Sequence, residues 1–455
     1  MINNSIKLYL DSKSEPSSLA IFRIGFGIIM FYSLIRFWAK GWIESIYIKP
    51  LLHFKYYGFE WVESLGQFNY ILFLICIIST VFVTFGYKYK QSIIIFFLTF
   101  TYIELIDKTT YLNHYYFISI LSFLMIMIPA NAALSIDNKK RGFSYNSVPK
   151  WSIDSLKLLI VIVYLYAGIA KINSDWLCHS LPLSIWLTSK YHLFFLGDLF
   201  QKDFIHQLMS WGGMIYDISI PFLLINRKTR LFGFSLVVLF HIMTAILFPI
   251  GMFPYIMIFS VIIFFDTKTH KSIINRISWM LGKIKRSKNT IQKREYVVWK
   301  NQKILLCIIS LFFLFQIILP FRHCLYKGEL FWTEEGYRFS WRVMLVEKVG
   351  SAVFTIKDQD SNQEQEIDNS MFLTKFQEKQ MSFQPDFILE YAHFIGDYYK
   401  ENGYQNPSVY VDCFVSLNGR ISQRLIDKNV DLYPIKESFK QKKWILPLKD
   451  DIKGL

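Results

Sequence analysis

Hydrophobic positions along the chain fall into nine long runs separated by short polar or basic segments. An α-helix needs about 20 apolar residues to cross roughly 30 Å of hydrocarbon, and each run is close to that length. The pattern predicts a mainly α membrane protein in which residues 1–325 form a polytopic bundle of about nine transmembrane helices. The runs lie near residues 18–39, 69–87, 92–108, 114–130, 155–172, 208–226, 231–249, 251–266 and 302–320.

After about Phe331 the pattern changes, because charged residues, period-two runs and turn-forming residues replace the apolar stretches. Residues 326–455 are therefore predicted to form an extramembrane α+β domain. The aromatic-rich residues 41–66 are predicted to form an interfacial segment on the membrane face that carries this domain. Asn418-Gly419 is a pair that favours a tight turn after a strand. Strands are expected at 339–347, 350–358 and 408–417, and helices at 371–381 and 385–401.

Composition supports the membrane assignment and excludes several other classes. Hydrophobic residues make up 53% of the chain and charged residues only 19%, whereas soluble domains carry about 25% charged residues. The 21 Gly and 13 Pro are too few for a collagen-like or disordered chain. The five cysteines are far apart and form no C-x-x-C pair, so neither a zinc site nor a disulfide scaffold is indicated, and no metal is expected.

The formal charge of +15 is concentrated in one segment. Residues 267–303 contain eleven Lys or Arg against a single Glu295, a net charge of +10. Such clustering is typical of a cytoplasmic loop and does not indicate a nucleic-acid partner. With a cytoplasmic amino terminus, the basic segments 87–90, 139–141, 226–230 and 267–303 all fall on the cytoplasmic side, which places the domain after Pro320 on the periplasmic or lumenal side. Met1 to Glu15 is polar, and no cleavable signal peptide is expected.

Ionisable side chains inside the predicted spans each cost a few kcal/mol and need a reason. Alternating orientation brings several of them toward one leaflet, and His241 lies ~15 Å from the inner end of its span. We expect them to share one cavity that opens on the outer side. The polar residues in or at the ends of spans are Arg23, Arg36, Glu104, Asp107, Asn113, His114, Lys171, Asp217 and His241.

Lys171 is the sharpest candidate, because it follows an apolar helix directly. Burial disfavours the charged form of an amine, and a neutral amine is a usable general base; the alternative is a lysine that extends to the lipid head groups. His114, preceded by Asn113, could anchor a ligand oxygen or bond a main-chain carbonyl at the interface. His241 could line a pocket or be a satisfied core histidine. Asp217 is expected to be a structural partner of a basic residue such as Arg23.

The usual motifs of soluble cofactors and nucleophiles do not occur in the sequence. There is no G-x-x-x-x-G-K-[ST], no G-x-G-x-x-G that opens a helix, no H-E-x-x-H and no G-x-S-x-G. These motifs hold phosphates, dinucleotides, zinc or a nucleophilic serine. A lipid-soluble cofactor therefore fits the predicted membrane cavity better than a soluble one.

Segments around the same residues resemble the vitamin K-dependent gamma-glutamyl carboxylase family, including bacterial homologues with an HTTM-type membrane domain. They occur in the family's order from residue 17 to about 430. The segment 167–176 is similar to the family's catalytic-lysine segment, and 332–342 to the start of its extramembrane domain. The matching segments are 18–27 (SLAIFRIGFG), 112–114 (LNH), 129–131 (PAN), 135–137 (SID), 167–176 (AGIAKINSDW), 240–241 (FH), 250–255 (IGMFPY) and 332–342 (WTEEGYRFSWR).

This resemblance implies a chemistry for three of the candidate residues. Lys171 would deprotonate vitamin K hydroquinone, either phylloquinol or menaquinol, and the reaction with O2 would give a strong base that takes a glutamate γ-proton. CO2 addition would then give γ-carboxyglutamate and vitamin K epoxide. Asn113 and His114 would hold the cofactor oxygen, and His241 would belong to the same pocket. Water exclusion would preserve the strength of the base.

The resemblance also implies partners and a location: membrane lipid, a Glu-containing peptide or protein substrate, and a quinone reductase that supplies the hydroquinone. Abundant Lys, Ile and Phe hint at an AT-rich bacterial gene and hence at a bacterial inner membrane. Animal members are longer at the carboxyl end and use part of the lumenal region to hold a substrate propeptide, and Phe321 stands where a Tyr is expected in them. Two alternatives therefore stay open: a quinol-dependent oxidase or epoxidase without peptide carboxylation, and a transporter or structural scaffold.

Overall fold

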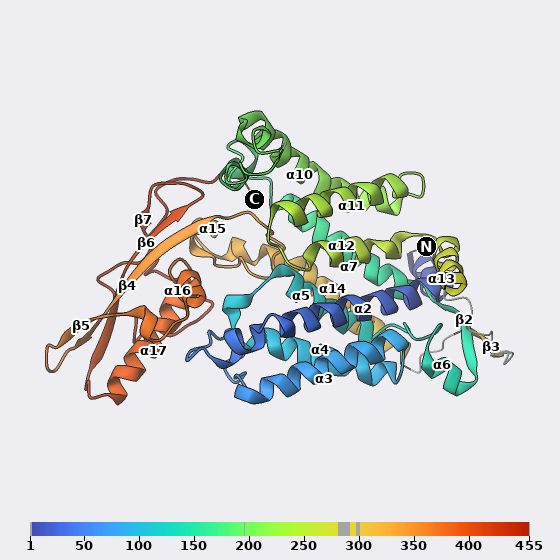
Figure 1. The fold of residues 1–455 in the computed structure, drawn as a ribbon, viewed down its shortest axis with the longest axis horizontal. Helices are drawn as coiled ribbons and strands as arrows, with labels where there is room; N and C mark the ends of the chain where they lie inside the picture. Colours follow the sequence, from blue (N-terminus) through green and yellow to red (C-terminus); the bar gives the residue numbers. More distant parts are fainter. Residues whose placement is uncertain (1, 195, 281–291, 297–300, 455) are drawn as a thin grey trace.

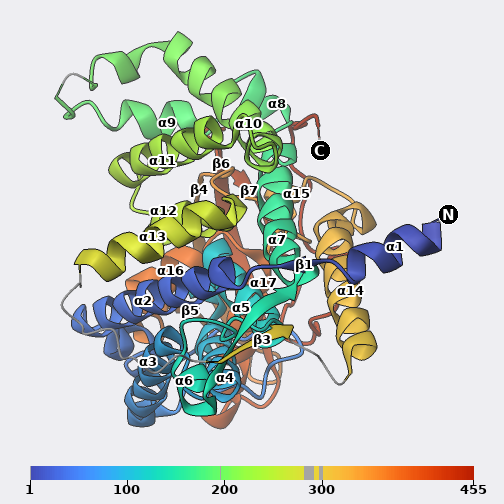
Figure 2. The same ribbon diagram turned by 90° about the vertical axis from the view of Figure 1, so that its right-hand side faces the viewer.

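The computed structural model describes residues 2–194, 196–280, 292–296 and 301–454. A helical bundle occupies most of its length, and a smaller unit of sheet and helices lies at one end (Figure 1). Figure 2 shows helix α7, Lys150–Ile169, between a group formed by α2 to α5 and a group formed by α10 and α11. There are two hydrophobic cores: one lies within the bundle, and the other extends from beneath the sheet to Phe54, to residues between 170 and 205, and to Leu247.

All nine apolar runs are helical, which confirms the predicted polytopic helical fold. Within the described residues, seven helices are long and apolar enough to cross a membrane, and two apolar helices are shorter. The shorter ones are α5, Asn113–Ile126, and α12, Phe253–Ser260, which continues as a 3₁₀ turn to Phe264. The other spans are α2 (Ser17–Ala39), α3 (Asn69–Phe85), α4 (Tyr89–Ile106), α7, α10 (Asp203–Ile225), α11 (Arg230–Leu247) and α14 (Gln302–Ile318).

Arg23 joins the first helices of the bundle. Its fully buried guanidinium donates hydrogen bonds to the carbonyl oxygens of Ala130, at 2.8 Å, and Leu134, at 2.5 Å, and also to those of Ala133 and Thr84. These carbonyls end helices or lie in the loop after α5, where they need donors. The expected pairing of Arg23 with Asp217 is wrong, because main-chain oxygens take the hydrogen bonds of the guanidinium.

The basic segments lie together at the end of the bundle opposite the sheet (Figure 1). A second, three-stranded sheet forms there in the order β1-β2-β3. The predicted basic loop 267–303 is thus partly structured, because it contains α13 and β3; residues 281–291 and 297–300 lie outside the described residues. The elements at this end are α1 (Ile2–Leu10), β1 (Lys13–Ser14), α6 (Ile136–Arg141), β2 (Phe143–Pro149), α13 (Thr267–Met280) and β3 (Gln292–Tyr296).

The C-terminal unit is an antiparallel sheet in the order β5-β4-β6-β7 with helices packed on one face. Strands β4 and β6 pair over their full length, from Lys348 opposite Leu417 to Asp358 opposite Pro407. Their alternate side chains form a core with α17. The elements are β4 (Lys348–Asp358), β5 (Glu364–Ile367), α16 (Lys375–Met381), α17 (Pro385–Glu401), β6 (Pro407–Leu417) and β7 (Gln423–Arg424).

Most predicted elements of this unit are present, with two differences. Helix α17 has the predicted bounds, and Asn418 and Gly419 both have the left-handed backbone that a tight turn requires. Helix α16 begins at Lys375, later than predicted, because Thr374 and Gln377 form a capping box that fixes its start. The predicted strand 339–347 is wrong: these residues form turns, and the sheet begins only at Lys348.

Buried charges link the bundle to the C-terminal unit. Lys108, just after α4, pairs with Asp386 at 3.0 Å and with Glu390 at 2.9 Å, both on α17. Asp386 also accepts a hydrogen bond from Arg338 at 2.8 Å. Burial favours the neutral carboxyl, but the Arg338 guanidinium and the Lys108 ammonium outweigh it and hold the pKa of Asp386 well below its usual range. Phe54, from the aromatic-rich segment, packs against Phe387 with ring centroids 4.9 Å apart.

Replacing Asp386 tests this link. Asp386→Asn is expected to lower the free energy of unfolding by about 2 kcal/mol, because two buried cations each lose a charged hydrogen-bond partner but keep another carboxylate. Since the folded pKa is depressed, the stabilisation is present above the unfolded value of about 3.9 and is lost as pH falls through the folded pKa. Thermal unfolding in detergent at neutral pH measures the first effect, and a series that falls from about pH 5 to as low a pH as the protein tolerates follows the start of the second.

Asp412→Asn is the matched control, because its pair with Arg424, at 2.8 Å, is partly exposed on both sides. An exposed pair contributes less than about 1 kcal/mol. Equal shifts for the two variants, or a loss at Asp386 that does not depend on pH, would contradict the assigned role of the buried link.

Candidate functional site

A cavity of about 200 Å³ lies between α7, α10, α11 and α12. Val343 and Met344, from the chain just before the C-terminal sheet, complete its lining. Its walls are largely aromatic and aliphatic, and its polar groups come from three helices. Among the described residues, Lys171 is the only lysine or arginine that lines it. Its wall includes Tyr164, Ala167, Lys171, Trp176, Trp186, Asp217, Phe240, His241, Phe253, Val343 and Met344.

Lys171 forms an ion pair with Asp217 inside this cavity. The Nζ atom is 2.7 Å from Oδ2 of Asp217 and also donates to the carbonyl oxygen of Ala167 at 3.0 Å. Both side chains are less than a tenth exposed, and Nζ lies 5.4 Å from the ring centroid of Trp176. Lys171 therefore does not extend to the lipid head groups, the alternative considered from the sequence.

Close packing of α7 against α10 explains how the pair forms. At Gly168 a Cβ atom would come within 2.6 Å of the Ile218 side chain and 2.9 Å of its main-chain nitrogen. Only glycine allows α10 to approach this near, and the approach places Asp217 beside the end of α7. The chain then turns sharply, because the Asn173 side chain accepts from the Trp176 main-chain N–H and begins the short helix α8, Ser174–Leu177.

His241 contributes the second polar group of the cavity. Its Nε2 is 3.1 Å from the Tyr164 hydroxyl, which fixes the plane of the ring. Its Nδ1 is buried and has no hydrogen-bond partner among the described residues, and the same is true of the Tyr216 hydroxyl. A buried polar atom without a hydrogen-bond partner lowers the stability of the protein. Nδ1 of His241, which lies beside a cavity, is therefore a candidate to form a hydrogen bond with a bound ligand.

His114 and Asn113 lie beside the cavity and do not line it. The His114 ring is 5.8 Å from that of Phe253, and Phe253 is 5.6 Å from the His241 ring on its other side. Asn113 accepts from the Tyr111 hydroxyl at 3.0 Å and donates to the carbonyl oxygen of Arg342 at 3.2 Å. Asn113 thus positions a loop, and His114 supports the Phe253 wall.

That loop, residues 339–344, separates two cavities. Phe339 and Trp341 have φ of +60°, and Met344 has φ of +55°. Left-handed backbone at three bulky residues so close together is strained, and such strain persists only where the surroundings enforce it. Phe339 faces one cavity and Met344 the other. Val343 and Met344, which are neighbours in the sequence, both line the small cavity, so the loop does not alternate as a strand does.

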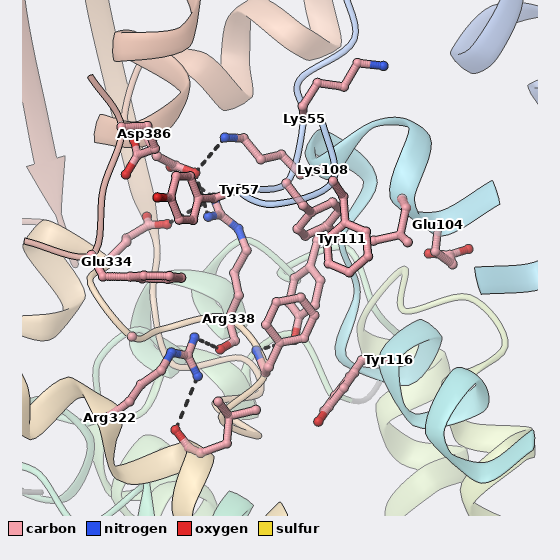
Figure 3. A pocket seen from close by; sticks show the side chains of 18 of the residues that line it. Lys55, Tyr57, Glu104, Lys108, Tyr111, Tyr116, Arg322, Glu334, Arg338 and Asp386 are labelled. Atoms are coloured by element: carbon pink, nitrogen blue, oxygen red, sulfur yellow. Dashed lines mark hydrogen bonds and ion pairs between the residues drawn. The ribbon is translucent and has the colours of Figure 1, made fainter. Parts of the chain in front are cut away.

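A second, larger cavity of about 980 Å³ lies between α4, α5, α14 and the C-terminal unit (Figure 3). It contains Glu104, the acid near the end of α4, together with Lys108, Arg322 and Arg338. The expectation of one shared cavity is therefore wrong. Lys171, Asp217 and His241 share the small cavity, Glu104 lines the large one, and His114 lines neither.

Sequence reasoning missed several residues of the small cavity. Asp217 was assigned to another partner, and Tyr164, Phe240 and Phe253 were not singled out for roles. The available signal was charge: a lone acid and a lone lysine in neighbouring spans are expected to neutralise each other. Within the described residues no three His, Cys, Asp or Glu side chains are grouped as ligands for a metal ion.

The fold and the buried polar site define an integral helical membrane protein with an additional C-terminal domain. The HTTM domain description matches residues 12–268. The description "Vitamin K-dependent gamma-carboxylase, lumenal domain" matches residues 301–451. The chain therefore belongs to the vitamin K-dependent gamma-carboxylase family. No solved structure matches it.

A double-variant cycle tests the Lys171–Asp217 pair. Lys171→Met or Asp217→Leu alone leaves one buried charge uncompensated and is expected to cost about 3–5 kcal/mol in the free energy of unfolding. The double variant removes both charges and is expected to be more stable than the sum of the single effects predicts, by about 1–3 kcal/mol. Unfolding in detergent, followed by temperature or denaturant, measures the three variants.

The pair Lys157 and Asp154 provides the control, because it lies on the same helix α7 with nitrogen and oxygen 3.7 Å apart and both side chains nearly a third exposed. Lys157→Met, Asp154→Leu and their combination are expected to be additive within about 0.5 kcal/mol. Additive effects at Lys171 and Asp217 as well would show that the two buried groups do not stabilise each other.

Proposed function

We propose that the protein is a vitamin K-dependent gamma-carboxylase-like enzyme, a carbon–carbon lyase with coupled vitamin K epoxidation. The observation that carries this proposal is the buried Lys171–Asp217 pair, which shares an aromatic cavity with His241. Membership of the family supplies the reaction type. Titratable groups that are buried around a concave apolar site are typical of catalytic centres.

The small cavity suits a naphthohydroquinone. Phe240, Phe253 and Trp186 provide aromatic surfaces for a flat bicyclic ring, and the cavity volume of about 200 Å³ suits the ring system without its side chain. Nζ of Lys171 is available for a hydrogen bond with one ring oxygen. The unpartnered Nδ1 of His241 is available for a hydrogen bond with the other. Both phylloquinol and menaquinol carry this ring, so the cavity does not select between them.

Lys171 and Asp217 together would take up the proton of a hydroquinone hydroxyl. When bound, the hydroquinone, oxidised by O2, supplies the strong base that removal of a glutamate γ-proton needs before CO2 adds. Lys171 would receive the hydroxyl proton at Nζ and pass one of its own to Oδ2 of Asp217, 2.7 Å away. The pair then holds one more proton than before, and the ammonium faces the oxyanion.

This arrangement alters the role inferred for Lys171 from the sequence. A lone neutral amine would have to stay uncharged through burial alone. With a carboxylate at 2.7 Å, the amine has a partner in either protonation state. The base is therefore the pair, and Asp217 acts as the final proton acceptor.

Other residues of the site would position the ligand and exclude water. Tyr164 holds the His241 ring, and Asn113 holds the loop at Arg342, so we assign Asn113 and His114 to support of the cavity wall. The mainly apolar lining keeps water away, which preserves the strength of a base formed inside. The Trp186 indole donates to Glu347 at 2.6 Å and ties the cavity to the C-terminal unit.

The proposal extends to domain boundaries and location. Residues 1–325 would form the membrane part and 326–455 the extracytoplasmic domain, in a bacterial inner membrane with a cytoplasmic amino terminus. The described parts of the four basic segments cluster at the end opposite the sheet, which supports this orientation because cytoplasmic loops carry the excess of Lys and Arg. A Glu-containing peptide or protein would be the substrate, and a quinone reductase would supply the hydroquinone.

One observation favours the alternative of a quinol oxidase or epoxidase without carboxylation. A glutamate side chain needs a cation or strong donors for its carboxylate. In the described part of the chain, Lys171 is the only lysine or arginine that lines the small cavity, and Asp217 already pairs with it. The purified protein, given vitamin K hydroquinone, O2, labelled bicarbonate and a Glu-containing peptide, separates the two functions. Label in the peptide together with epoxide supports carboxylation, and epoxide alone supports the alternative.

Lys171→Ala is expected to reduce epoxide formation by roughly a hundredfold or more, because general-base catalysis contributes that much. Asp217→Asn keeps the shape but removes the final acceptor, and we expect an intermediate loss. Epoxide formation, followed by chromatography, measures both variants. Lys157→Ala on the same helix is the control and should retain full activity. Turnover of Lys171→Ala at the unaltered rate would reject the assignment of the base.

His241→Phe is expected to raise the KM for hydroquinone roughly tenfold, because one hydrogen bond to the ligand is lost while the base remains. Tyr164→Phe keeps the imidazole and removes only the group that orients it, so a smaller rise is expected. Steady-state kinetics of epoxide formation separates KM from kcat. A fall in kcat at unchanged KM would place His241 in the chemical step and not in binding.

A further inference from the structure

The large cavity has two chemically different halves at two depths. Its deeper half is formed by Phe97 of α4, Phe123 of α5, and Phe312 and Phe315 of α14. Phe315 is more than half exposed, so this half opens toward the hydrocarbon around the bundle. The other half lies beneath the C-terminal unit and is lined by charged residues. A cavity whose lining is apolar at one end and charged at the other suits an amphiphilic ligand.

Helix α14 makes few contacts with the rest of the bundle, which leaves room for such a molecule. Figure 2 shows it at the margin of the helical group. It contacts α5 through the Phe123 and Phe312 rings, 5.7 Å apart, and through the Tyr116 hydroxyl, which donates to Gln316 at 2.7 Å. Between these contacts and α4 the cavity holds about 980 Å³, several times the volume of the small one.

The charges of the polar half are mostly neutralised within the protein. Lys108 and Arg338 pair with Asp386, and Lys442 pairs with Glu437 at 2.8 Å. Seven acidic and five basic residues line the cavity, which leaves it slightly negative, with a formal charge of −2. A negatively charged ligand would meet net repulsion there.

Within the described residues, five charged groups of this lining form no ion pair: Lys55, Glu60, Glu104, Arg322 and Glu335. Glu104 lies in α4 and Arg322 lies in the turn after α14, so these two come from the membrane part. The Arg322 guanidinium donates to the carbonyl oxygens of Leu319 and Arg338 and to the Ser340 hydroxyl, but it contacts no carboxylate in the described part of the chain. Glu104, on the opposite wall, makes no hydrogen bond or ion pair with any described residue, and Figure 3 shows its carboxylate apart from the Asp386 cluster. A charged group at this depth needs a partner.

We propose that the large cavity binds a glycerophospholipid whose head group carries a primary amine, of the phosphatidylethanolamine type. The Arg322 guanidinium suits the phosphate, and the Glu104 carboxylate suits the ammonium group. The aromatic side chains of α4, α5 and α14 contact the upper parts of the acyl chains. The site is separate from the small cavity, and the proposal does not depend on the proposed reaction.

The volume distinguishes this ligand from a second quinol. A bicyclic ring fills a cavity like the small one, whereas a phosphate, an amine, a glycerol unit and the first parts of two chains need several times that space. An ammonium also neutralises Glu104, which a quinol cannot do. Hydrogen-bond donors matter as well, because a quaternary amine carries no N–H to give to a carboxylate.

Native mass spectrometry of the full chain in detergent tests the proposal, with phosphatidylethanolamine, phosphatidylcholine, phosphatidylglycerol and menaquinol added at equal concentrations. We expect the unaltered protein to retain one phosphatidylethanolamine in preference to the others and to gain thermal stability from it. Glu104→Gln is nearly isosteric, and it should lower the preference for phosphatidylethanolamine over phosphatidylcholine roughly tenfold, the worth of a hydrogen bond to a charged group.

A steric pair of variants locates the lipid. Ile120→Trp fills the cavity wall on α5 and should abolish retention, whereas Leu98→Trp lies on the lipid-facing side of α4, outside the cavity, and should not. Lys171→Ala should also retain the lipid, so failure of the proposed reaction would leave this result intact. Equal retention of all phospholipids, stronger retention of phosphatidylglycerol, displacement by menaquinol, or retention by Ile120→Trp would each overturn the proposal.

Discussion

The site depends on one ion pair that is buried in the membrane part of the protein. Lys171 and Asp217 come from different helices, and neither charge is tolerable there without the other. The pair fixes the distance between α7 and α10, and Gly168 makes that distance accessible. Both side chains line the same aromatic cavity as His241. Under the proposed function, a ring bound there would meet the ion pair and the imidazole, so stability and chemistry would rest on the same two side chains.

The C-terminal domain completes the cavity as well as covering it. Met344 and Val343 form part of its wall, and Trp186 and Asn113 bond to the chain on either side of them. The domain is held in place by the buried charges around Lys108 and Asp386, far from the reacting groups. An interface of this kind keeps water out of the site without placing further charged groups inside it. The membrane part alone would leave the cavity without its Val343 and Met344 wall.

Much of the fold can be predicted from the local pattern of residues in the sequence, whereas much of the site cannot. Nine apolar runs and the bounds of α17 are visible in the sequence because each depends on residues a few positions apart. Lys171 and His241 were selectable because ionisable groups in apolar spans are rare. The partnership with Asp217 depends on how closely two helices pack, which no local pattern records. The loop 339–344 has its conformation set by the two cavities and the helices around it, with left-handed backbone at three residues, and no local pattern records that.

Residues 339–344 are a common boundary of the two cavities, and this has a thermodynamic consequence. Under the two proposals above, a molecule that shifts Phe339 from one side would also shift Met344 on the other, since the left-handed backbone at Phe339, Trp341 and Met344 leaves the loop few other conformations. Thermodynamic linkage would make this coupling reciprocal: each occupant would change the affinity of the other by the same factor. The lipid composition of the surrounding bilayer would then influence the affinity for a redox ring, without any contact between the two molecules.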